Sequence, residues 1–328
     1  MKNIAIVAGG NSLEHEISLK SAAQIMSAID KEKYNPFLVV IKGLQWQVKQ
    51  VGKNDIDIDK NDFSFVENGE KITFACAYVT IHGTPGEDGK LQGYFDMIRL
   101  PYSTCDVLTS ALSFNKFACK SYLATTGICM PKGIQVQKGE NVDVDDIVKN
   151  IGLPLFVKPN EGGSSFGISK VKHANDLQSA IDEALKEDTS VIIEESIDGR
   201  ELTCGLIKSG NKKLLFPVTE ITTKNEFFDY DAKYNGESEE ITPADISEEA
   251  TNLVHDVSSF IYDKMRCKGL VRVDYIYSRG KLYFIEINIA PGMTEQSLVP
   301  QQIQAMGETL TNVFTFQIEG LLENNSVK

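Results

Sequence analysis

Short apolar runs alternate with amphipathic segments along the first third of the chain, and this alternation constrains the fold more than any other feature. Residues 3–7 (NIAIV) form one apolar run, and others lie at residues 37–41 and 74–81. An amphipathic segment follows the first run, from about residue 14 to residue 29. Strands that alternate with helices predict a parallel sheet covered by helices. We therefore expect an α/β fold that begins with an open parallel sheet.

The rest of the chain predicts a second α/β unit followed by a region that is mostly strand. We expect helices around residues 114–124, at residues 177–185 and after Ser247, and strands at residues 155–158, 168–171, 191–194, 202–207, 214–221, 270–277 and 282–288. The polar segment 222–242 is long for a connection within a compact domain, so we expect it to be a lid. A chain of 328 residues suggests two or three domains.

Charge and cysteine content exclude several classes of function. The formal net charge is −13 and no basic run is present, which argues against nucleic-acid binding. No apolar stretch is long enough to span a bilayer, so we expect no membrane partner. The six cysteines form no CxxC pair, which argues against a zinc ribbon. We expect them to be buried thiols in a cytoplasmic protein.

Residues 269–288 predict a β-hairpin with a three-residue loop, in which Gly280 takes the left-handed position. If Tyr277 faces Lys281 at the end of the ladder, Arg272 pairs with Glu286 across it. Because side chains alternate between faces, four polar residues then share one face: Arg272, Asp274, Glu286 and Asn288. The core face is expected to carry Val271, Val273, Tyr275, Tyr277, Tyr283, Ile285 and Ile287.

Three oxygen ligands beside one arginine are typical of a Mg²⁺ site that meets phosphate. Mg²⁺ prefers carboxylate and amide oxygens and keeps open positions for its substrate. Asp274, Glu286 and Asn288 are therefore candidate metal ligands. A solvated sheet face with cross-strand ion pairs is the alternative, and the hairpin alone does not decide between them.

A glycine-rich loop between two predicted strands gives a second candidate site. Lys158 stands at the end of the first strand, and the loop combines Gly162 and Gly163 with the hydroxyls of Ser164 and Ser165. Glycines let backbone N–H groups approach phosphate oxygens. No Gly-Lys-Ser/Thr follows, so this is not a Walker loop. A hairpin with an ordinary flexible tip explains the loop equally well.

Four further residues carry weaker indications when each is taken alone. Glu14 stands at a predicted helix start, where an acidic residue also simply stabilises the helix dipole. His82 is one of four histidines and could be a packed turn residue. Lys116 and Lys233 could be solvated charges.

In sequence order these motifs resemble those of the D-alanine–D-alanine ligase family of the ATP-grasp superfamily. The motifs are AGGNSLEHEIS from residue 8, HGTPGEDG from residue 82, ALSFNK from residue 111, VKP from residue 157, GSSFG from residue 163, YDAKY from residue 230, RVD from residue 272 and GMTEQSLVP from residue 292. They span almost the whole chain, and ATP-grasp enzymes in general do not need several of them.

The resemblance implies an ATP-grasp fold with an N-terminal Rossmann-like domain at residues 1–104, a central subdomain at 105–195 and a C-terminal subdomain at 196–328. It implies ATP as co-substrate with two Mg²⁺ or Mn²⁺ ions, and a cytoplasmic homodimer that serves peptidoglycan synthesis. The carboxylate of one D-alanine would attack the γ-phosphate to give an acyl phosphate and ADP. The amine of a second D-alanine would then displace phosphate.

The resemblance also implies a role for each matching residue. The first ammonium group would be held by Glu14, with Ser164 and Tyr234. The tetrahedral intermediate would meet Arg272 and the Gly292 backbone, and the second substrate would meet Ser297, Leu298 and His82. ATP phosphates would contact Lys116, Lys158, Ser165 and the lid residue Lys233. The adenine and ribose would lie near Glu194, Ile197 and Glu201, and the metal ions would bind Asp274, Glu286 and Asn288.

Three alternatives remain at this point. A relative that makes D-alanyl-D-lactate or D-alanyl-D-serine would share these motifs. Another ATP-grasp enzyme that joins a carboxylate to an amine would share most of them. A catalytically inactive nucleotide-binding protein is disfavoured, because Lys158 and the candidate metal ligands are all present.

Overall fold

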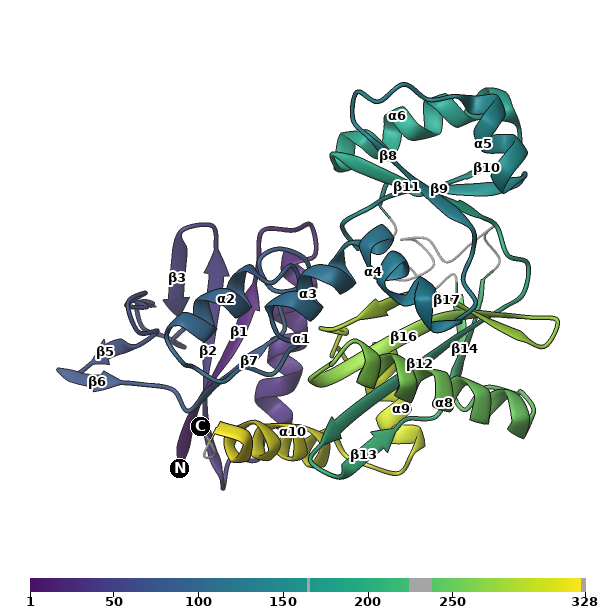
Figure 1. The fold of residues 1–328 in the computed structure, drawn as a ribbon. Helices are drawn as coiled ribbons and strands as arrows, with labels where there is room; N and C mark the ends of the chain where they lie inside the picture. The colour runs from purple at the N-terminus through teal and green to yellow at the C-terminus, as the bar shows by residue number, and fades with distance from the viewer. Residues whose placement is uncertain (164–165, 224–237, 326–328) are drawn as a thin grey trace.

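The computed structural model describes all of the chain except residues 164–165, 224–237 and 326–328. Its ribbon shows three parts, each built around a sheet (Figure 1). The N-terminal part is purple to blue, the teal part lies at the top of the view, and the green and yellow part lies below it. No helix of the described residues is long and apolar enough to cross a membrane.

The N-terminal sheet has its parallel strands at one side. Its order is β4-β3-β2-β1-β7, with bounds β1 Lys2–Gly9, β2 Tyr34–Lys42, β3 Gln45–Val48, β4 Ile56–Asp57 and β7 Cys76–Val79. β1 runs parallel to β2 and β7, as expected, while β3 and β4 extend the sheet antiparallel. Helices α1 (His15–Ala28) and α2 (Lys90–Met97) and the hairpin β5–β6 (Phe65–Glu67, Glu70–Ile72) complete this part.

The middle part is a four-stranded antiparallel sheet of order β10-β9-β11-β8. Its elements are α3 Val107–Phe114, α4 Lys116–Leu123, β8 Gly133–Gln137, α5 Val144–Ile151, β9 Leu155–Pro159, β10 Ser169–Val171, α6 Leu177–Glu187 and β11 Ser190–Glu195, with single 3₁₀ turns at Ala124–Thr126 and Ala174–Asp176. The predicted apolar stripe of α6 is confirmed, since its buried residues are Leu177, Ala180, Ile181 and Ala184. The stripe packs on β9 and β11 and forms this part's core.

The third part is a sheet of order β15-β14-β12-β16-β17, with β13 also paired to β12. Its elements are β12 Arg200–Ser209, β13 Lys212–Leu215, β14 Thr219–Thr223, β15 Ser238–Ile241, α8 Glu248–Lys264, β16 Gly269–Ser278, β17 Lys281–Asn288, α9 Leu298–Ala305 and α10 Leu310–Asn325. The strand expected at 214–221 is divided into β13 and β14. The predicted cap of α8 is confirmed, because the Ala250 N–H donates to the Ser247 hydroxyl.

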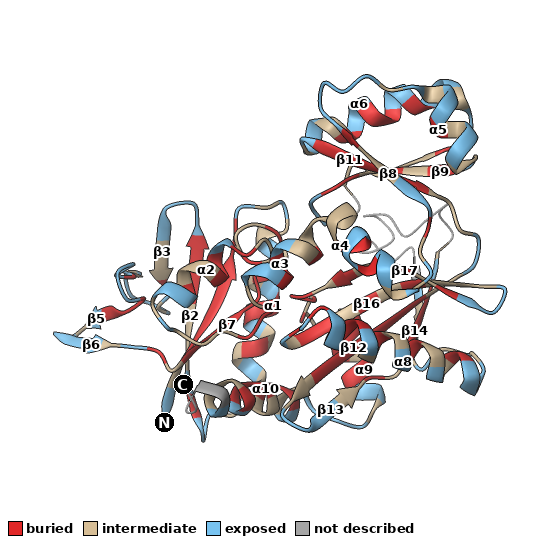
Figure 2. Cartoon of the chain, viewed as in Figure 1, coloured by how far each residue is buried: buried red, intermediate tan, exposed pale blue. Residues whose placement is uncertain are grey.

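The C-terminal helix returns to the beginning of the chain. Phe314 and Ile318 of α10 are fully buried in one apolar cluster with Ile4 and Ile6 of β1. Figure 1 shows α10 in yellow next to the purple strands, close to both termini. In Figure 2 the sheet strands carry most of the buried residues, while the helix surfaces facing outward are exposed. The first and last segments of the chain therefore stabilise each other.

The register of the hairpin β16–β17 differs from the prediction. Ser278 pairs with Lys281, so the turn has two residues, Arg279 (φ 50°) and Gly280 (φ 77°). Two residues with positive φ match the twist of the strands better than a three-residue loop does. The expected pairing of Tyr277 with Lys281 is therefore wrong.

A β-bulge restores the polar face that the two-residue turn alone would displace. The register shifts between Asp274 and Tyr275, where β17 carries one extra residue, Ile285. Asp274 then pairs with Glu286, and Arg272 pairs with Asn288 instead of Glu286. The four polar residues still share a face, but Leu282 and Phe284 enter the core where Tyr283 and Ile285 were expected.

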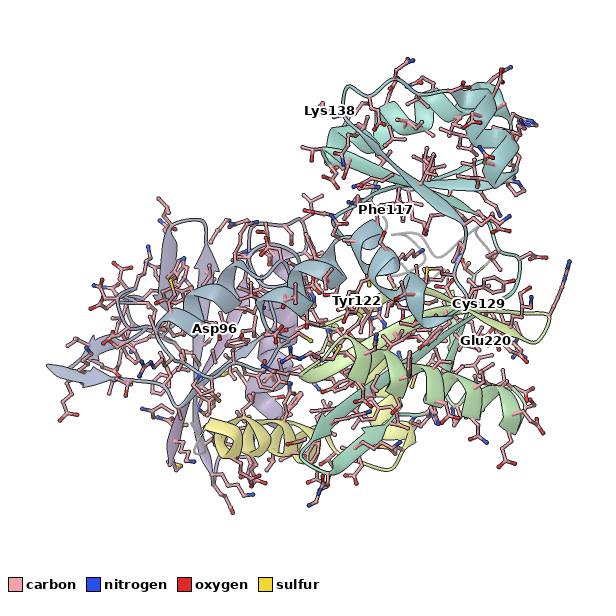
Figure 3. The ribbon with its side chains drawn as sticks, viewed as in Figure 1. Asp96, Phe117, Tyr122, Cys129, Lys138 and Glu220 are labelled. Carbon is pink, nitrogen blue, oxygen red and sulfur yellow. The ribbon has the colours of Figure 1, made fainter. Side chains whose placement is uncertain are left out.

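The cysteines follow the prediction with one exception. All six are free thiols, and five are buried. Cys129 is exposed, so the expectation that all six are buried is wrong at that position. It lies in the segment between α4 and β8, where it is labelled in Figure 3.

Candidate active site

A cavity of about 700 Å³ lies between the middle sheet and the C-terminal sheet. It gathers residues that the sequence analysis assigned to ATP and to metal: Lys116, Lys158, Glu194, Ile197, Glu201, Arg272, Asp274 and Glu286. Glu220 of β14, labelled in Figure 3, lines the same cavity and binds Arg200 through two hydrogen bonds of 2.6 Å. The fold thus brings these segments, distant in sequence, to one hollow.

A smaller cavity of about 400 Å³ adjoins the first. Both are lined by Lys116, Ile168 and Glu286, and the smaller one extends to Ser12 and Glu14 at the start of α1. Such a pair of adjoining cavities offers room for a nucleotide in one and a small substrate in the other.

A buried ion cluster holds one of the candidate phosphate ligands. Lys158 Nζ donates to Glu194 Oε2 at 3.1 Å, and Lys120 Nζ donates to Glu194 Oε1. Lys158 of β9 pairs with Ile192 of β11, so Glu194 lies two residues further along the same face. The Glu194 carboxylate is therefore a counter-ion for two lysines.

The cluster keeps its charges despite its burial. Burial would raise the pKa of Glu194, but the charges and hydrogen bonds of Lys120 and Lys158 outweigh it and lower that pKa to about 2. Burial lowers the pKa of Lys120, which Glu194 opposes. Sequence reasoning missed Lys120. Its spacing of four residues from Lys116 on α4 was the available indication, because such residues share a helix face.

The glycine-rich loop meets α4 on one side and α1 on the other. Lys116 Nζ donates to the Gly162 carbonyl at 2.7 Å. The start of α4 is also tied to the end of β9, since the Phe117 N–H donates to Asn160 Oδ1 at 2.9 Å. A Cβ at Gly163 would lie 3.0 Å from Glu14 Oε2, so a larger residue there would require that carboxylate to move by a few tenths of an ångström. Glu14 precedes α1 as its N-cap residue, but its side chain makes no capping bond.

Three residues of the polar face of β16 and β17 line the larger cavity: Arg272, Asp274 and Glu286. Side-chain hydrogen bonds already engage Arg272, Asp274 and Asn288. Arg272 donates to both Asp274 oxygens at 2.8 Å, and Thr203 donates to Asp274 Oδ1 at 2.5 Å. Asn288 Oδ1 accepts the Ala290 N–H at 3.1 Å. Within the described part of the chain, no group of three or more His, Cys, Asp or Glu residues is arranged to hold a metal ion. A metal site on this face therefore depends on the amide of Asn288 together with Asp274 and Glu286.

The segment after β17 leads to the predicted second-substrate residues. Ser297 is the N-cap residue of α9, but its hydroxyl accepts the Thr294 N–H at 3.1 Å instead of bonding the helix. A Cβ at Gly292 would lie 2.8 Å from the Ser297 hydroxyl, so these two residues are in contact. Leu298 is buried and begins α9, whose N-terminus is suited to a carboxylate.

His82 is buried just after β7 and stays uncharged near neutral pH. Burial lowers its pKa, against the opposing effects of the Glu14 charge and a hydrogen bond to the Ala290 backbone. Among the described residues its Nε2 has no hydrogen-bond partner. The Ser12 hydroxyl donates to the His82 carbonyl at 2.8 Å, which joins this residue to the start of α1.

Glu87 is a further ionisable residue of this site, and sequence reasoning did not single it out within the motif from His82 to Gly89. The Gly83 N–H donates to Glu87 Oε2 at 2.6 Å. Burial raises the pKa of Glu87 to about 8, helped by the negative charges of Glu14 and Glu286. At neutral pH this side chain is therefore largely protonated.

The raised pKa makes a pH-dependent contribution to stability. Between pH 4.5, the ordinary pKa of a glutamate, and about pH 8, the folded protein keeps a proton on Glu87 that the unfolded chain has lost. Stability therefore falls as pH rises through that window. A glutamine at position 87 cannot ionise. Between pH 5 and 8 we therefore expect the free energy of unfolding of Glu87→Gln to fall by about 2 kcal/mol less than that of the parent protein. This figure is smaller than 1.36 kcal/mol per pKa unit would give, because Glu87 is partly exposed to solvent.

Urea unfolding at pH 5, 6, 7 and 8 checks this expectation. The matched control is Glu70→Gln, an exposed carboxylate on β6, which should follow the parent protein. Parallel pH profiles for Glu87→Gln and the parent protein would contradict the raised pKa.

Some of the predicted residues cannot be placed. Ser164, Ser165, Lys233 and Tyr234 lie outside the described residues, as does most of the expected lid. On either side of that segment, β14 and β15 pair with each other antiparallel.

Comparison with known proteins gives a consistent result. The family model described as D-ala D-ala ligase N-terminus matches residues 3–105, and the one described as D-ala D-ala ligase C-terminus matches residues 123–319. The D-alanine–D-alanine ligase of Parabacteroides distasonis is 53% identical over 328 residues, covering 100% of this chain and 99% of the relative. That of Bacteroides fragilis is 51% identical over 319 residues, covering 97% and 98%.

Solved structures agree with the sequence relatives. The VanG D-Ala:D-Ser ligase from Enterococcus faecalis superposes with a TM-score of 0.88 at 32% identity, covering 98% of this chain and 99% of that one. The D-alanine–D-alanine ligase from Bacillus anthracis complexed with ATP gives a TM-score of 0.80 at 27% identity, covering 100% and 99%. The chain therefore belongs to the D-alanine–D-alanine ligase family and has the ATP-grasp fold.

Proposed function

We propose that this protein joins two D-alanines at the expense of ATP, and so supplies D-alanyl-D-alanine for peptidoglycan. The observation that carries the proposal is the larger cavity, where Lys116 and Lys158 face the polar strands β16 and β17. Cations opposite carboxylates suit a site that binds a nucleotide and transfers its terminal phosphoryl group. The full-length relatives named D-alanine–D-alanine ligase supply the substrate class.

ATP would lie in the larger cavity, with its phosphates toward Lys116 and Lys158 and its adenine and ribose toward Ile197 and Glu201. The Glu194 carboxylate acts on the nucleotide indirectly, because it holds Lys158 in place. Ser165 and Lys233 are proposed as further phosphate contacts on the family resemblance alone.

The polar face suits Mg²⁺ because it offers two carboxylates and one amide oxygen, held by Asp274, Glu286 and Asn288. Bound there, two Mg²⁺ or Mn²⁺ ions would neutralise negative charge on the phosphates. Arg272, which bonds Asp274 in this structure, would then be available to the reacting carboxyl group.

In the proposed reaction the carboxylate of the first D-alanine attacks the γ-phosphorus of ATP, which gives an acyl phosphate and ADP. Glu14 would hold the ammonium group of that D-alanine in the smaller cavity, with Ser164 and Tyr234 as partners. Because Glu14 lies against Gly163, the same loop touches both candidate subsites.

The second D-alanine would then attack the acyl carbon through its free amine, and phosphate would leave. Arg272 and the Gly292 N–H would stabilise the tetrahedral intermediate, as oxyanion donors do. Ser297 and Leu298 at the start of α9 would receive the carboxylate of the second D-alanine. The uncharged His82 would lie near the second D-alanine, and it would add no positive charge to repel the ammonium form of that substrate.

A D-serine acceptor is the second candidate function. It rests on the structural likeness to the VanG D-Ala:D-Ser ligase, whose TM-score is 0.88. D-Lactate is a third acceptor that related ligases use, and its hydroxyl needs no deprotonated amine.

Competition between acceptors tests these candidates. With ATP, Mg²⁺ and D-alanine at pH 7, equal concentrations of D-alanine, D-serine and D-lactate are offered, and the products are separated by mass. We expect the dipeptide D-alanyl-D-alanine to exceed each alternative at least tenfold, about 1.4 kcal/mol of discrimination. The control is a reaction with L-alanine in place of D-alanine and the other acceptors, which should release no phosphate above background. Equal incorporation of D-lactate or D-serine would overturn the dipeptide assignment.

Three broader proposals rest on the family resemblance and not on contacts of this structure. They are the domain boundaries after residues 104 and 195, a homodimeric assembly and a cytoplasmic location. The family models support the first boundary most closely, since the N-terminal match ends at residue 105.

A further inference from the structure

The loop between β17 and α9 is held rigidly by bonds to its backbone. The Ala290 N–H donates to Asn288 Oδ1, the Met293 N–H to the Ser21 hydroxyl and the Thr294 N–H to the Ser297 hydroxyl, each at 3.1 Å. Ala290 and Met293 are also buried. Two of these bonds come from the loop's own ends, but the bond to Ser21 comes from the N-terminal part of the molecule.

The bond from the Met293 N–H to Ser21 holds the C-terminal side of the neighbouring Gly292. A peptide unit is planar, so fixing the Met293 N–H fixes the plane that also holds the Gly292 carbonyl and the Gly292 Cα. The Gly292 N–H belongs to the preceding peptide unit, so the bond acts on it through the position of that Cα. On the other side of Gly292, Pro291 has a fixed φ. Gly292 has the freest backbone of Pro291, Gly292 and Met293. It lies between one covalent constraint, the ring of Pro291, and one hydrogen bond, that of the Met293 N–H.

Ser21 can serve as a firm anchor because its helix is itself fixed. Ser21 is fully buried on α1. One turn earlier, the fully buried Ser18 donates to the Thr80 carbonyl at 2.7 Å and accepts the Gly9 N–H at 2.9 Å, which ties α1 to the N-terminal sheet. Glu14 precedes Ser21 by seven residues, about 10 Å along the helix axis. One helix thus carries both the proposed anchor of the first substrate and the anchor of the acceptor loop.

We propose that Ser21 is a positioning residue for the acyl-transfer step, which acts by holding the Gly292 N–H where the intermediate's oxygen develops. The proposal rests on the function of Gly292 given above. Ser21 is fully buried and lines neither cavity, so its loss should affect the second step of the reaction and leave phosphoryl transfer from ATP intact. The substitution changes no residue of the loop between β17 and α9, because the hydroxyl that is removed belongs to Ser21 on α1.

The test is Ser21→Ala, compared by the ratio of ADP formed to dipeptide formed. We expect dipeptide formation to fall about tenfold, less than the hundredfold or more that follows removal of an oxyanion donor itself. The KM for ATP should not change, while the KM for the second D-alanine should rise. The acyl phosphate then has a longer lifetime, and part of it reacts with water to give D-alanine and phosphate. The ratio of ADP formed to dipeptide formed should therefore rise clearly above one.

Ser258→Ala is the matched control. Ser258 is also fully buried and bonds the Tyr275 hydroxyl at 2.8 Å, on the core side of β16. It should lower stability to a similar degree but keep the ratio at one. Should Ser21→Ala fail to fold, Ser21→Cys keeps the size with a weaker acceptor and should raise the ratio in the same direction.

A ratio of one with normal dipeptide formation in Ser21→Ala would overturn the proposal, and so would an equal fall of ADP and dipeptide. A parent protein that makes no dipeptide from D-alanine would instead disprove the proposed function.

Discussion

Glu286→Gln is expected to lower kcat by at least a hundredfold while the protein stays folded. Glu286 lines both cavities and pairs with Asp274 across the ladder, so it faces the place where nucleotide and first substrate would meet. Neutralising a phosphoryl group with a metal ion contributes several kcal/mol in such sites, and each 1.36 kcal/mol corresponds to a factor of ten. Glutamine keeps the size but loses the charge that would hold the ion in the proposed site.

Steady-state kinetics as a function of Mg²⁺ concentration check this prediction. The half-saturating Mg²⁺ concentration should rise together with the fall in kcat, while urea unfolding should move little. The control is Glu239→Gln, an exposed carboxylate on β15 of the same sheet, which should behave like the parent protein. A folded Glu286→Gln protein with near-normal turnover would remove the metal assignment.

Local patterns predicted the faces of elements better than the register between them. The apolar stripe of α6 and the cap at Ser247 depend on residues three or four apart, so the sequence shows them directly. The hairpin register depends on whether Arg279 adopts positive φ, and on a bulge at Ile285. Alternation of side chains has a period of two, so one extra residue exchanges the faces beyond it. The polar face was predicted correctly only because the bulge compensates for the shorter turn.

Contacts between distant segments explain what the sequence could not show. Lys120 and Glu194 are 74 residues apart, and only the packing of α4 on the middle sheet makes them partners. Ser21 and Met293 are 272 residues apart. Phe314 of α10 packs with Ile4 because the end of the chain returns to the first strand. Each of these residues looks ordinary in its own segment, so periodicity and motif spacing carry no information about the contact.

Several residues that the family motifs singled out do line the larger cavity, but the motifs did not give their bonding partners. Glu194 was assigned to the adenine and ribose region, and it does line that cavity. Its carboxylate, however, is bonded to two lysines, so any contact with the nucleotide would have to come from other atoms of this segment.

Glu194→Gln is expected to have the second large effect, on stability as well as on ATP binding. Removing the only negative charge of this buried trio leaves Lys120 and Lys158 without their counter-ion. Breaking a buried ion pair in this way typically costs about 3–5 kcal/mol, because the remaining charge stays desolvated. Lys158 would also lose the bond that directs it, so the KM for ATP should rise about tenfold.

A double exchange separates the charge effect from simple loss of packing. Lys120→Met combined with Glu194→Gln removes one positive and one negative charge and keeps the volume similar, so it should recover part of the lost free energy of unfolding. Glu195→Gln, at the next position and partly exposed, is the control and should change stability by less than about 0.5 kcal/mol. Because Lys120 and Glu194 are in direct contact, their effects should not add. If the losses in free energy of unfolding were additive, the cluster would not act as one electrostatic unit. The position of Lys158 beside the nucleotide cavity would then need another explanation.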